Sequence, residues 1–382
     1  MRARTPHIHT RRSRGIGTAG LGLVLVTALS LSLAGCDLAP ADGSGSAGAE
    51  GSAPTEVTLV VHDSFVDGDA FAAAASAATG YDVHVLTSGD GGELTNTLVL
   101  TKGAPIADAF FGVNDTFASR LIDNDVVVPI RPRALPDRAA SIATAQFVAG
   151  GQASESTTFP MIPVDLGAIC INVDTDWFAA HEVAPPASYD DLLDPAYAGL
   201  TVVIDPTAST TGAAFLTGTV AAFGDPGYLG YWERLVKNGV RIEPGWSEAY
   251  NGQFTQGGGD GTFPIVLSYS TSPAWTLSDD GTRSTTEALL NTCTTQVEYA
   301  GVLAGAANPE GAEAVVEYLL SPEFQASIPE SMYMYPVDAT VELPEDWERF
   351  AALPDAPHDL TPAEVGASRE RWLKAWSETV GW

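Results

Sequence analysis

Hydroxyl and aromatic side chains stand together where a predicted buried strand ends, in the stretch VLSYSTSPAW at residues 266–275. The residues of this stretch that could contact a ligand are Ser268, Tyr269, Ser270, Thr271, Ser272 and Trp275. Hydroxyls hydrogen-bond the polar part of a small molecule, and aromatic faces stack on a flat or cationic part. Trp246 and Tyr250 add two rings in the otherwise polar stretch EPGWSEAYNGQF. The pattern favours a binding site, with ordinary core packing of the rings as the alternative.

Two polar turns are predicted to open helices that could hold an anion. In DPTASTTGAAF a strand passes through a polar loop into a helix, and Ser209, Thr210 or Thr211 is a natural N-cap. The free N–H groups at such a helix start bind a phosphate or a hydroxyl. GDGGEL repeats the arrangement around Asp90 and Gly91, with backbone that a ligand can approach closely. Either turn alone is typical of any capped helix, but together, facing one cleft, they would bind a ligand.

Three acids also follow predicted strands: Asp63, Asp90 and Asp205. They could form a metal site or an acid/base pair, but acids at such positions more often orient turns and helix starts. The sequence contains no G-x-S-x-G, no Walker loop and no H-E-x-x-H, and its three cysteines are too widely spaced for a zinc ribbon. We therefore expect binding rather than catalysis, with no catalytic residue, no metal and no cofactor.

The elements that position these residues alternate between strand and helix. Strands are predicted at 56–65, 81–88 and 106–113, and helices at 69–80, 92–103 and 114–125. The alternation restarts at 166–173, and the chain finishes in helices at 311–328 and 361–380, the second with a capping box at Thr361 and Glu364. This indicates two α/β units with mostly parallel sheets, whose ligand lies at the carboxyl ends of the strands. We assign lobe 1 to 56–163 and 298–382, and lobe 2 to 164–297.

The first 55 residues read as an export signal and a tether. An Arg-rich start leads into an apolar run, and residues 33–36, Leu-Ala-Gly-Cys, resemble a bacterial lipobox with Cys36 as the lipidated residue. An ordinary secretory signal is the alternative, and the Arg11–Arg12 pair also permits twin-arginine export, although the stretch RRSRGIG matches that signal only weakly. We predict a signal peptide at 1–35, a flexible tether at 36–55, and a protein anchored by lipid to the outer face of the cell membrane.

Two cysteines remain in the predicted folded part, Cys170 and Cys293. An exported protein often joins such residues in a disulfide. Cys170, however, lies within the apolar strand pattern LGAICINV, which favours a buried thiol. We expect two separate buried thiols.

The formal net charge of −30 excludes nucleic acid as a partner, because phosphates would be repelled. Removal of residues 1–35, which hold five arginines and no acid, would make the chain more negative still. Such a surface attracts a cationic ligand, and adaptation to a salty habitat explains it equally well.

Taken in order, several stretches resemble those of the thiamine-binding proteins of bacterial ABC importers. They are VHDSF, DPTASTTG, GWSEAY, VLSYSTSPAW, QVE, MYPV and the C-terminal stretch from LTPAEV, within residues 57–376. The resemblance implies two α/β lobes joined by hinge strands, in a type II-like periplasmic-binding-protein fold. It implies that thiamine or its phosphate esters lie between the lobes, and that an ABC permease receives the solute.

The same resemblance implies ligand contacts from His62, Asp63, Asp90, Gly91, Ser209, Thr210, Trp246, Tyr269, Ser270, Thr271, Ser272 and Trp275. This chain has His62 where enteric members have Tyr, and Trp275 where a smaller ring is common. Asn114 and Asp115 reverse the order of the corresponding acid and amide. The rival hypotheses are a binding protein for ferric iron, with Tyr333 and Tyr335 as candidate ligands, for a polyamine or for a phosphonate. An exported enzyme acting on a thiamine-like or phosphorylated substrate is the rival of a different class.

Overall fold

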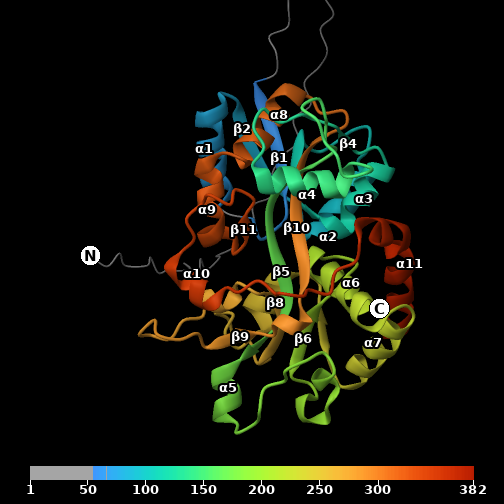
Figure 1. The fold of residues 1–382 in the computed structure, drawn as a ribbon, viewed down its shortest axis with the longest axis vertical. Coiled ribbons are helices and arrows are strands. Elements are labelled where there is room, and N and C mark those ends of the chain that lie inside the picture. The colour runs from blue at the N-terminus through green and yellow to red at the C-terminus, as the bar shows by residue number, and fades with distance from the viewer. Residues whose placement is uncertain (1–54, 66) are drawn as a thin grey trace, which may run out of the picture. The chain divides into compact units, whose positions relative to one another are not determined.

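Two groups of parallel strands are joined by two antiparallel strands in one sheet (Figure 1). The computed structural model describes residues 55–65 and 67–382. In spatial order the sheet runs β2 (Asp82–Thr87), β1 (Glu56–Val61), β3 (Ala109–Asn114), β10 (Thr294–Leu303), β5 (Ile162–Asp174), β8 (Ile265–Tyr269), β6 (Thr201–Ile204) and β7 (Arg241–Glu243). Short strands β4 (Val127–Val128), β9 (Thr286–Ala288) and β11 (Tyr335–Pro336) pair with β10, β5 and β5 respectively.

The strand directions define the two lobes. In lobe 1, β1 pairs in parallel with β2 and β3. In lobe 2, β6 pairs in parallel with β7 and β8. Strands β5 and β10 pair antiparallel with each other and run between the two groups as hinge strands. The prediction of two α/β lobes with mostly parallel sheets is confirmed, and the assigned lobe limits at 163/164 and 297/298 fall within these two hinge strands.

Helices cover both faces of the sheet. They are α1 (Gly68–Thr79), α2 (Gly91–Leu100), α3 (Asp115–Asp123), α4 (Asp137–Phe147), α5 (Thr175–Ala180), α6 (Thr210–Phe223), α7 (Gly227–Lys237), α8 (Pro309–Leu319), α9 (Pro322–Met332), α10 (Glu345–Phe350) and α11 (Pro362–Val380). The period of two in β1 decides which face each side chain meets. Val57, Leu59 and Val61 join the core under α1 and α8, whereas Val60 joins the core that includes residues of α2 and α3.

The helix predicted at 311–328 is divided in two. Helix α8 ends at Leu319, and α9 starts with Pro322 at its first position, capped by the Ser321 side chain. Proline fits the first turn of a helix, where its missing N–H group costs nothing, whereas inside a helix it removes a backbone hydrogen bond, so Pro322 favours a new helix start at this point. The predicted capping box of α11 is confirmed, since the Thr361 and Glu364 side chains each bond the other's backbone N–H.

Helix α11 contacts both lobes, packing on α3 of lobe 1 and α7 of lobe 2 (Figure 1). On the lobe 2 side, Trp376 is fully buried and meets the Trp232 ring edge-on at 5.5 Å. On the lobe 1 side, the Arg369 guanidinium lies over the Phe117 ring. The C-terminal helix therefore belongs to the contact between the lobes as much as to either of them.

Cys170 and Cys293 form a disulfide, with their Cα atoms 4.2 Å apart. Both residues are fully buried, as expected, but the prediction of separate thiols is wrong. Ile169 of β5 is the register partner of Thr294 of β10, so the antiparallel pairing brings the neighbouring residues 170 and 293 together. The disulfide thus joins the two hinge strands at their lobe 2 end.

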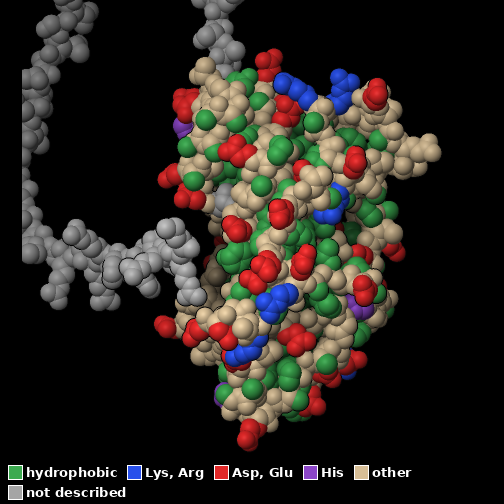
Figure 2. Space-filling view, turned by 60° about the vertical axis from the view of Figure 1, so that its left-hand side comes forward, with side chains coloured by type: hydrophobic (Ala, Val, Ile, Leu, Met, Phe, Trp, Pro, Cys, Tyr) green, Lys and Arg blue, Asp and Glu red, His purple; other side chains and the backbone are tan. Residues whose placement is uncertain are grey.

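Acidic side chains are spread over the surface seen in Figure 2, where Lys and Arg are few. No helix within residues 55–65 and 67–382 is long and apolar enough to span a membrane. The predicted signal peptide, Cys36 and nearly all of the tether lie outside the described residues.

Candidate functional site

The polar loops that follow the strands, here called the polar tips, meet between the lobes at Asp90. This residue follows β2 in lobe 1. Its Oδ1 accepts a hydrogen bond from the backbone N–H of Thr210 at 3.0 Å, and its Oδ2 accepts one from that of Trp246 at 3.1 Å. Asp90 also caps its own helix α2 through the N–H of Gly91. Burial raises the pKa of this carboxyl, although the backbone donors oppose the shift. The Asp90 carboxyl therefore links the start of α2 in lobe 1 by hydrogen bonds to the segments of lobe 2 that contain Thr210 and Trp246.

Glycines let the two lobes approach closely at this point. A Cβ on Gly91 would lie 2.3 Å from Cγ2 of Thr210, and one on Gly92 would lie 2.5 Å from the Ala208 carbonyl. The N–H of Glu93 donates to the same Ala208 carbonyl at 2.9 Å. The backbone of the GDGGEL turn therefore lies against the DPTASTTG turn of the other lobe.

Ser209 is fully buried, and its hydroxyl accepts from the N–H of Gly212 and caps α6. The expected N-cap is thus confirmed. The first N–H group of this helix, that of Thr210, already donates to the Asp90 carboxyl. The Asp90 carboxyl of the protein itself therefore takes the place at the start of α6 that the sequence suggested for an anionic ligand.

Four aromatic rings surround a pocket of about 210 Å³. It is lined by Trp246, Tyr250, Asn251, Gln256, Gly257, Gly258, Ser272, Trp275, Thr276 and Tyr333. The rings of Trp246 and Tyr250 stack at 4.9 Å with planes 11° apart, and Trp275 meets the edge of Tyr333 at 4.5 Å. The predicted grouping of Trp246, Tyr250 and Trp275 is found here, and stacked or edge-on rings of this kind offer faces to a flat or cationic group.

The hydroxyls after β8 have different surroundings. Ser272 lines the aromatic pocket, and its Oγ lies 2.9 Å from that of Ser268, which accepts from the Trp246 indole N–H at 3.0 Å. Thr271 donates to the backbone carbonyl of Tyr333. Ser270 has a buried hydroxyl with no hydrogen-bond partner. Only Ser272 of these hydroxyls faces the pocket, while Ser268 and Thr271 hold its rings in place.

Two further pockets adjoin the same residues. One of about 220 Å³ is lined by four acids, Asp63, Asp90, Glu93 and Glu248, together with Gly89, Pro244 and Gly245. Another of about 40 Å³ is lined by His62, Ser64, Trp246, Tyr269, Glu298, Ser331, Met332, Tyr333 and Met334. The described residues that line the three pockets include no Lys or Arg. These pockets therefore have aromatic and acidic walls, and His62 is the one described residue in their linings that can take up a positive charge.

Tyr333 and Glu298 are the site residues that sequence reasoning missed. Tyr333 was expected only as an iron ligand, although it directly precedes the quoted MYPV stretch, and Glu298 ends the quoted QVE stretch. Two other candidates lie elsewhere. Tyr335 bonds the Ala351 carbonyl and packs on Trp347. Asp205 accepts from Thr207 and from the Trp382 indole, so it orients its turn.

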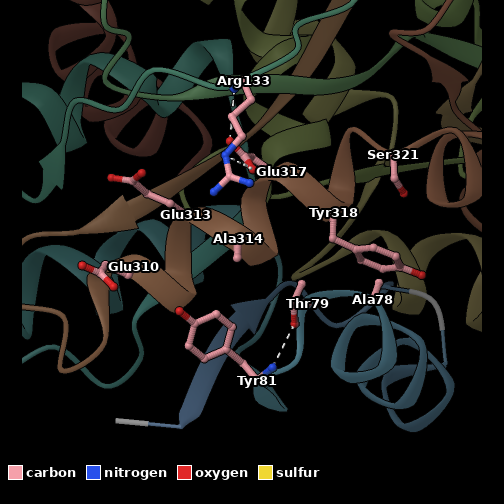
Figure 3. Close-up of a pocket in the computed structure, with 10 residues that line it drawn as sticks. All are labelled: Ala78, Thr79, Tyr81, Arg133, Glu310, Glu313, Ala314, Glu317, Tyr318 and Ser321. Atoms are coloured by element: carbon pink, nitrogen blue, oxygen red, sulfur yellow. Dashed lines mark hydrogen bonds and ion pairs between the residues drawn. The ribbon is translucent and has the colours of Figure 1, made fainter. Parts of the chain in front are cut away.

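A larger pocket lies away from these tips. It has a volume of about 580 Å³ and lies on lobe 1, where it is lined by side chains of α8 such as Glu313, by Tyr81 and by the end of α1 (Figure 3). Arg133, the only Lys or Arg among its lining residues, pairs with Glu317. In the described part of the chain, one group of three or more His, Cys, Asp or Glu has ligand atoms within 4.8 Å of one another. It comprises Glu56, Asp82 and His84, which are exposed on β1 and β2 at the strand ends opposite the tips.

The chain is similar to known bacterial solute-binding proteins. A family model described as bacterial extracellular solute-binding protein matches residues 104–356. The thiamine-binding periplasmic proteins of Escherichia coli and Salmonella typhimurium are each 29% identical to the chain, over 85% of the chain and 93% of the relative. That of Brucella abortus is 29% identical over 77% of the chain and 82% of the relative.

Among solved structures, a periplasmic thiamin binding protein aligns with a TM-score of 0.70 and 27% identity, over 85% of this chain and 96% of that one. Iron-bound HitA from Pseudomonas aeruginosa aligns with a TM-score of 0.63 and 19% identity, over 85% and 99%. AfuA from Actinobacillus pleuropneumoniae, with fructose-6-phosphate bound, aligns with a TM-score of 0.68 and 15% identity, over 85% and 98%. The last two alignments show a shared fold alone.

Proposed function

The chain belongs to the bacterial extracellular solute-binding protein family, and we propose that it captures thiamine between its two lobes. Thiamine carries a permanent cation in a flat thiazolium ring, joined to an aminopyrimidine and a hydroxyethyl tail. The observation that carries the proposal is the aromatic pocket around Trp246, which has acidic walls beside it and no basic residue in its lining. The similarity to thiamine-binding periplasmic proteins supports the same assignment.

In this proposal the thiazolium ring stacks on Trp246 and lies near Tyr333 and Trp275. The negative face of each aromatic ring attracts the cation, by about 0.5–2 kcal/mol per ring. Ser272 offers its hydroxyl in the same pocket, and Asp63 lies in the adjoining acidic pocket, where a carboxylate can accept from the pyrimidine amino group. These contacts bind and orient a solute, and no step breaks a bond in it.

We further propose that thiamine binds more tightly than its phosphate esters. The α6 start that could hold a phosphate already receives the Asp90 carboxyl. A phosphate placed there would be repelled by Asp90 and by the acids of the adjoining pocket, and no Lys or Arg lines the site to offset them. Free thiamine carries no such negative group.

Solute selection is tested by quenching of tryptophan fluorescence, because Trp246 and Trp275 both line the pocket. We would titrate the protein with thiamine, thiamine monophosphate, thiamine diphosphate, ferric citrate and spermidine. The proposal expects saturable quenching at the lowest concentration with thiamine, and weaker binding as phosphates are added. Tighter binding of ferric iron or spermidine would assign the site to those solutes, and chemical conversion of recovered thiamine would favour the enzyme hypothesis.

Two proposals extend beyond the site. We propose that Cys36 carries a lipid that holds the protein at the outer face of the membrane. We also propose that the closed lobes present the solute to an ABC permease. In the structure the lobes already touch through Ser64 and Ser247, whose hydroxyl oxygens are 3.1 Å apart, and through Asp90. Closure of this kind is how two-lobed proteins enclose a ligand.

A further inference from the structure

Two acidic side chains lie beside each other on the hinge strands, outside the contacts assigned so far. Asp165 of β5 and Glu298 of β10 are register partners, and they are 0% and 3% exposed. Neither oxygen of Asp165 receives a hydrogen bond from an N–H or hydroxyl donor. Two buried carboxyls this close cannot both ionise readily, and a shared proton turns their contact into a hydrogen bond.

The surroundings of the two carboxyls differ, because Glu298 accepts a hydrogen bond from an amide whereas neither oxygen of Asp165 has a donor. Burial, followed by the negative charge of Glu298, raises the pKa of Asp165 well above its ordinary value. Burial also raises the pKa of Glu298, but His62 and the hydrogen bond with Asp165 oppose that shift. The contacts therefore favour Glu298, which has an amide donor and His62 beside it, as the member of the pair that holds the negative charge.

Few groups offset that charge. Glu298 Oε1 accepts from the Gln296 amide at 3.3 Å, and Oε2 lies 3.8 Å from His62 Nε2, which is buried and has no hydrogen-bond partner. The titratable groups that act on Glu298 or face it from neighbouring elements are His62, Asp90, Asp115, Asp165 and Tyr269. His62 is the only member of that set that can become cationic.

Glu298 also reaches the ligand space. It lines the small pocket of about 40 Å³ together with Trp246 and Tyr333. The same two rings line the aromatic pocket of about 210 Å³. A flat cation in the aromatic pocket would therefore share Trp246 and Tyr333 with the adjoining pocket that Glu298 lines.

We propose that Glu298 supplies the negative charge that selects a cationic solute, and that Asp165 holds a proton beside it. This inference deepens, and rests on, the proposed capture of thiamine. A buried carboxylate without a full counter-charge is unfavourable in a low-dielectric surrounding, and a solute cation beside it offsets that penalty. A neutral molecule of the same shape gains the ring contacts but leaves the charge unpaired.

The test compares thiamine with a neutral analogue in which carbon replaces the thiazolium nitrogen. In the wild-type protein thiamine should bind at least about tenfold more tightly than the analogue. Glu298→Gln keeps the side-chain shape and removes the charge. It should weaken thiamine binding by about 30-fold or more, the effect of removing one partner of a buried charge pair, and leave analogue binding unchanged or stronger.

Two further variants separate local charge from other effects. Glu313→Gln makes the same change of net charge in the distant pocket on α8, and it should alter neither affinity. Asp165→Asn leaves the Glu298 charge in place, so the preference for thiamine over the analogue should persist. Loss of that preference in Asp165→Asn would overturn the role given to Asp165.

Equal losses of both ligands in Glu298→Gln, or no loss of thiamine, would overturn the inference. If that variant fails to fold, the affinities of the wild-type protein for thiamine and for the neutral analogue decide the question. Equal affinities would reject the role of Glu298 in selecting a charge, but they would leave the proposed capture of thiamine intact. A wild-type protein that binds neither ligand would overturn the proposed function, and this inference with it.

Discussion

Trp246 makes three kinds of contact at once. Its ring stacks on Tyr250, its indole N–H donates to Ser268, and its backbone N–H donates to Asp90 of the other lobe. The sequence indicated a special role, because a Trp between glycine and serine does not fit an amphipathic pattern. It could not indicate the Asp90 contact, which joins residues 156 positions apart.

Replacement of Trp246 by alanine should weaken thiamine binding by about 2–4 kcal/mol, the range for a buried aromatic hot spot. The physical reason is the loss of both the stacking face and the cation–π attraction. Calorimetric affinities would measure the effect, and thermal unfolding would report on the fold. The matched control is Trp177→Ala, which removes a ring of α5 that stacks on His181 outside the site and should leave the affinity for thiamine unchanged. An unchanged affinity would return Trp246 to a purely structural role.

Asp115 makes stability depend on pH. Burial and the negative charge of Asp359 raise its pKa to about 7. Between about pH 4 and pH 7 the folded protein keeps a proton on Asp115 that the unfolded chain releases, so this group lowers the free energy of unfolding as the pH rises through that window.

Asp115→Asn should therefore change little at pH 4 and stabilise the protein by about 4 kcal/mol at pH 8. Urea unfolding of both proteins at several pH values measures the difference. Asp69→Asn, an exposed acid in the first turn of α1, is the control. A difference between wild type and Asp115→Asn that stays constant with pH would contradict the assignment.

At the scale of elements, patterns within a short stretch predicted most of the fold. The alternation of strands and helices predicted the two lobes. The hydroxyls before α6 predicted its cap, which is Ser209, and Thr361 with Glu364 predicted the capping box of α11. Each of these depends on residues a few positions apart. The close packing of Gly91 and Gly92 against the other lobe depends on chain folding, so the glycines alone indicated only that something approaches them closely.

The disulfide was missed for the same reason. Its cysteines are 123 residues apart, and only the antiparallel pairing of β5 with β10 brings them together. The apolar pattern around Cys170 correctly indicated burial but carried no information about a partner.

Because the disulfide closes such a long loop, Cys170→Ala with Cys293→Ala should lower the free energy of unfolding by about 2–5 kcal/mol. Chemical denaturation of the oxidised wild type and the double variant measures this. Treatment with a reductant should lower the stability of the wild type toward that of the variant and leave the variant unaffected. Equal stability of the two oxidised proteins would show that the cross-link does not stabilise the fold.

At the scale of the whole molecule, the acidic composition indicated a cationic ligand, and the structure places uncompensated acids around the interlobe pockets. Composition alone could not distinguish attraction of a cationic ligand from adaptation to a salty habitat, because the number of charged residues does not say where they lie in the structure. The contact of α11 with both lobes was also beyond the sequence, since an amphipathic helix does not reveal its neighbours.

The proposed lipid anchor at Cys36 also concerns the whole chain. Cys36→Ala should move the protein from the membrane fraction to the soluble fraction, because the lipid acceptor is lost. Immunoblots of the two fractions measure the change, with Ser46→Ala in the predicted tether as the control. A Cys36→Ala protein that stays in the membrane fraction with its signal removed would contradict lipidation at this residue.

The central claim is that the site between the lobes binds thiamine, and calorimetric titration of the purified wild-type protein with thiamine tests it most directly. The account predicts one site per chain with a dissociation constant of about 1 μM or lower, equivalent to about 8 kcal/mol. It also predicts weaker binding of thiamine monophosphate under the same conditions. Absence of saturable heat with thiamine, or clearly tighter binding of the monophosphate, would contradict it.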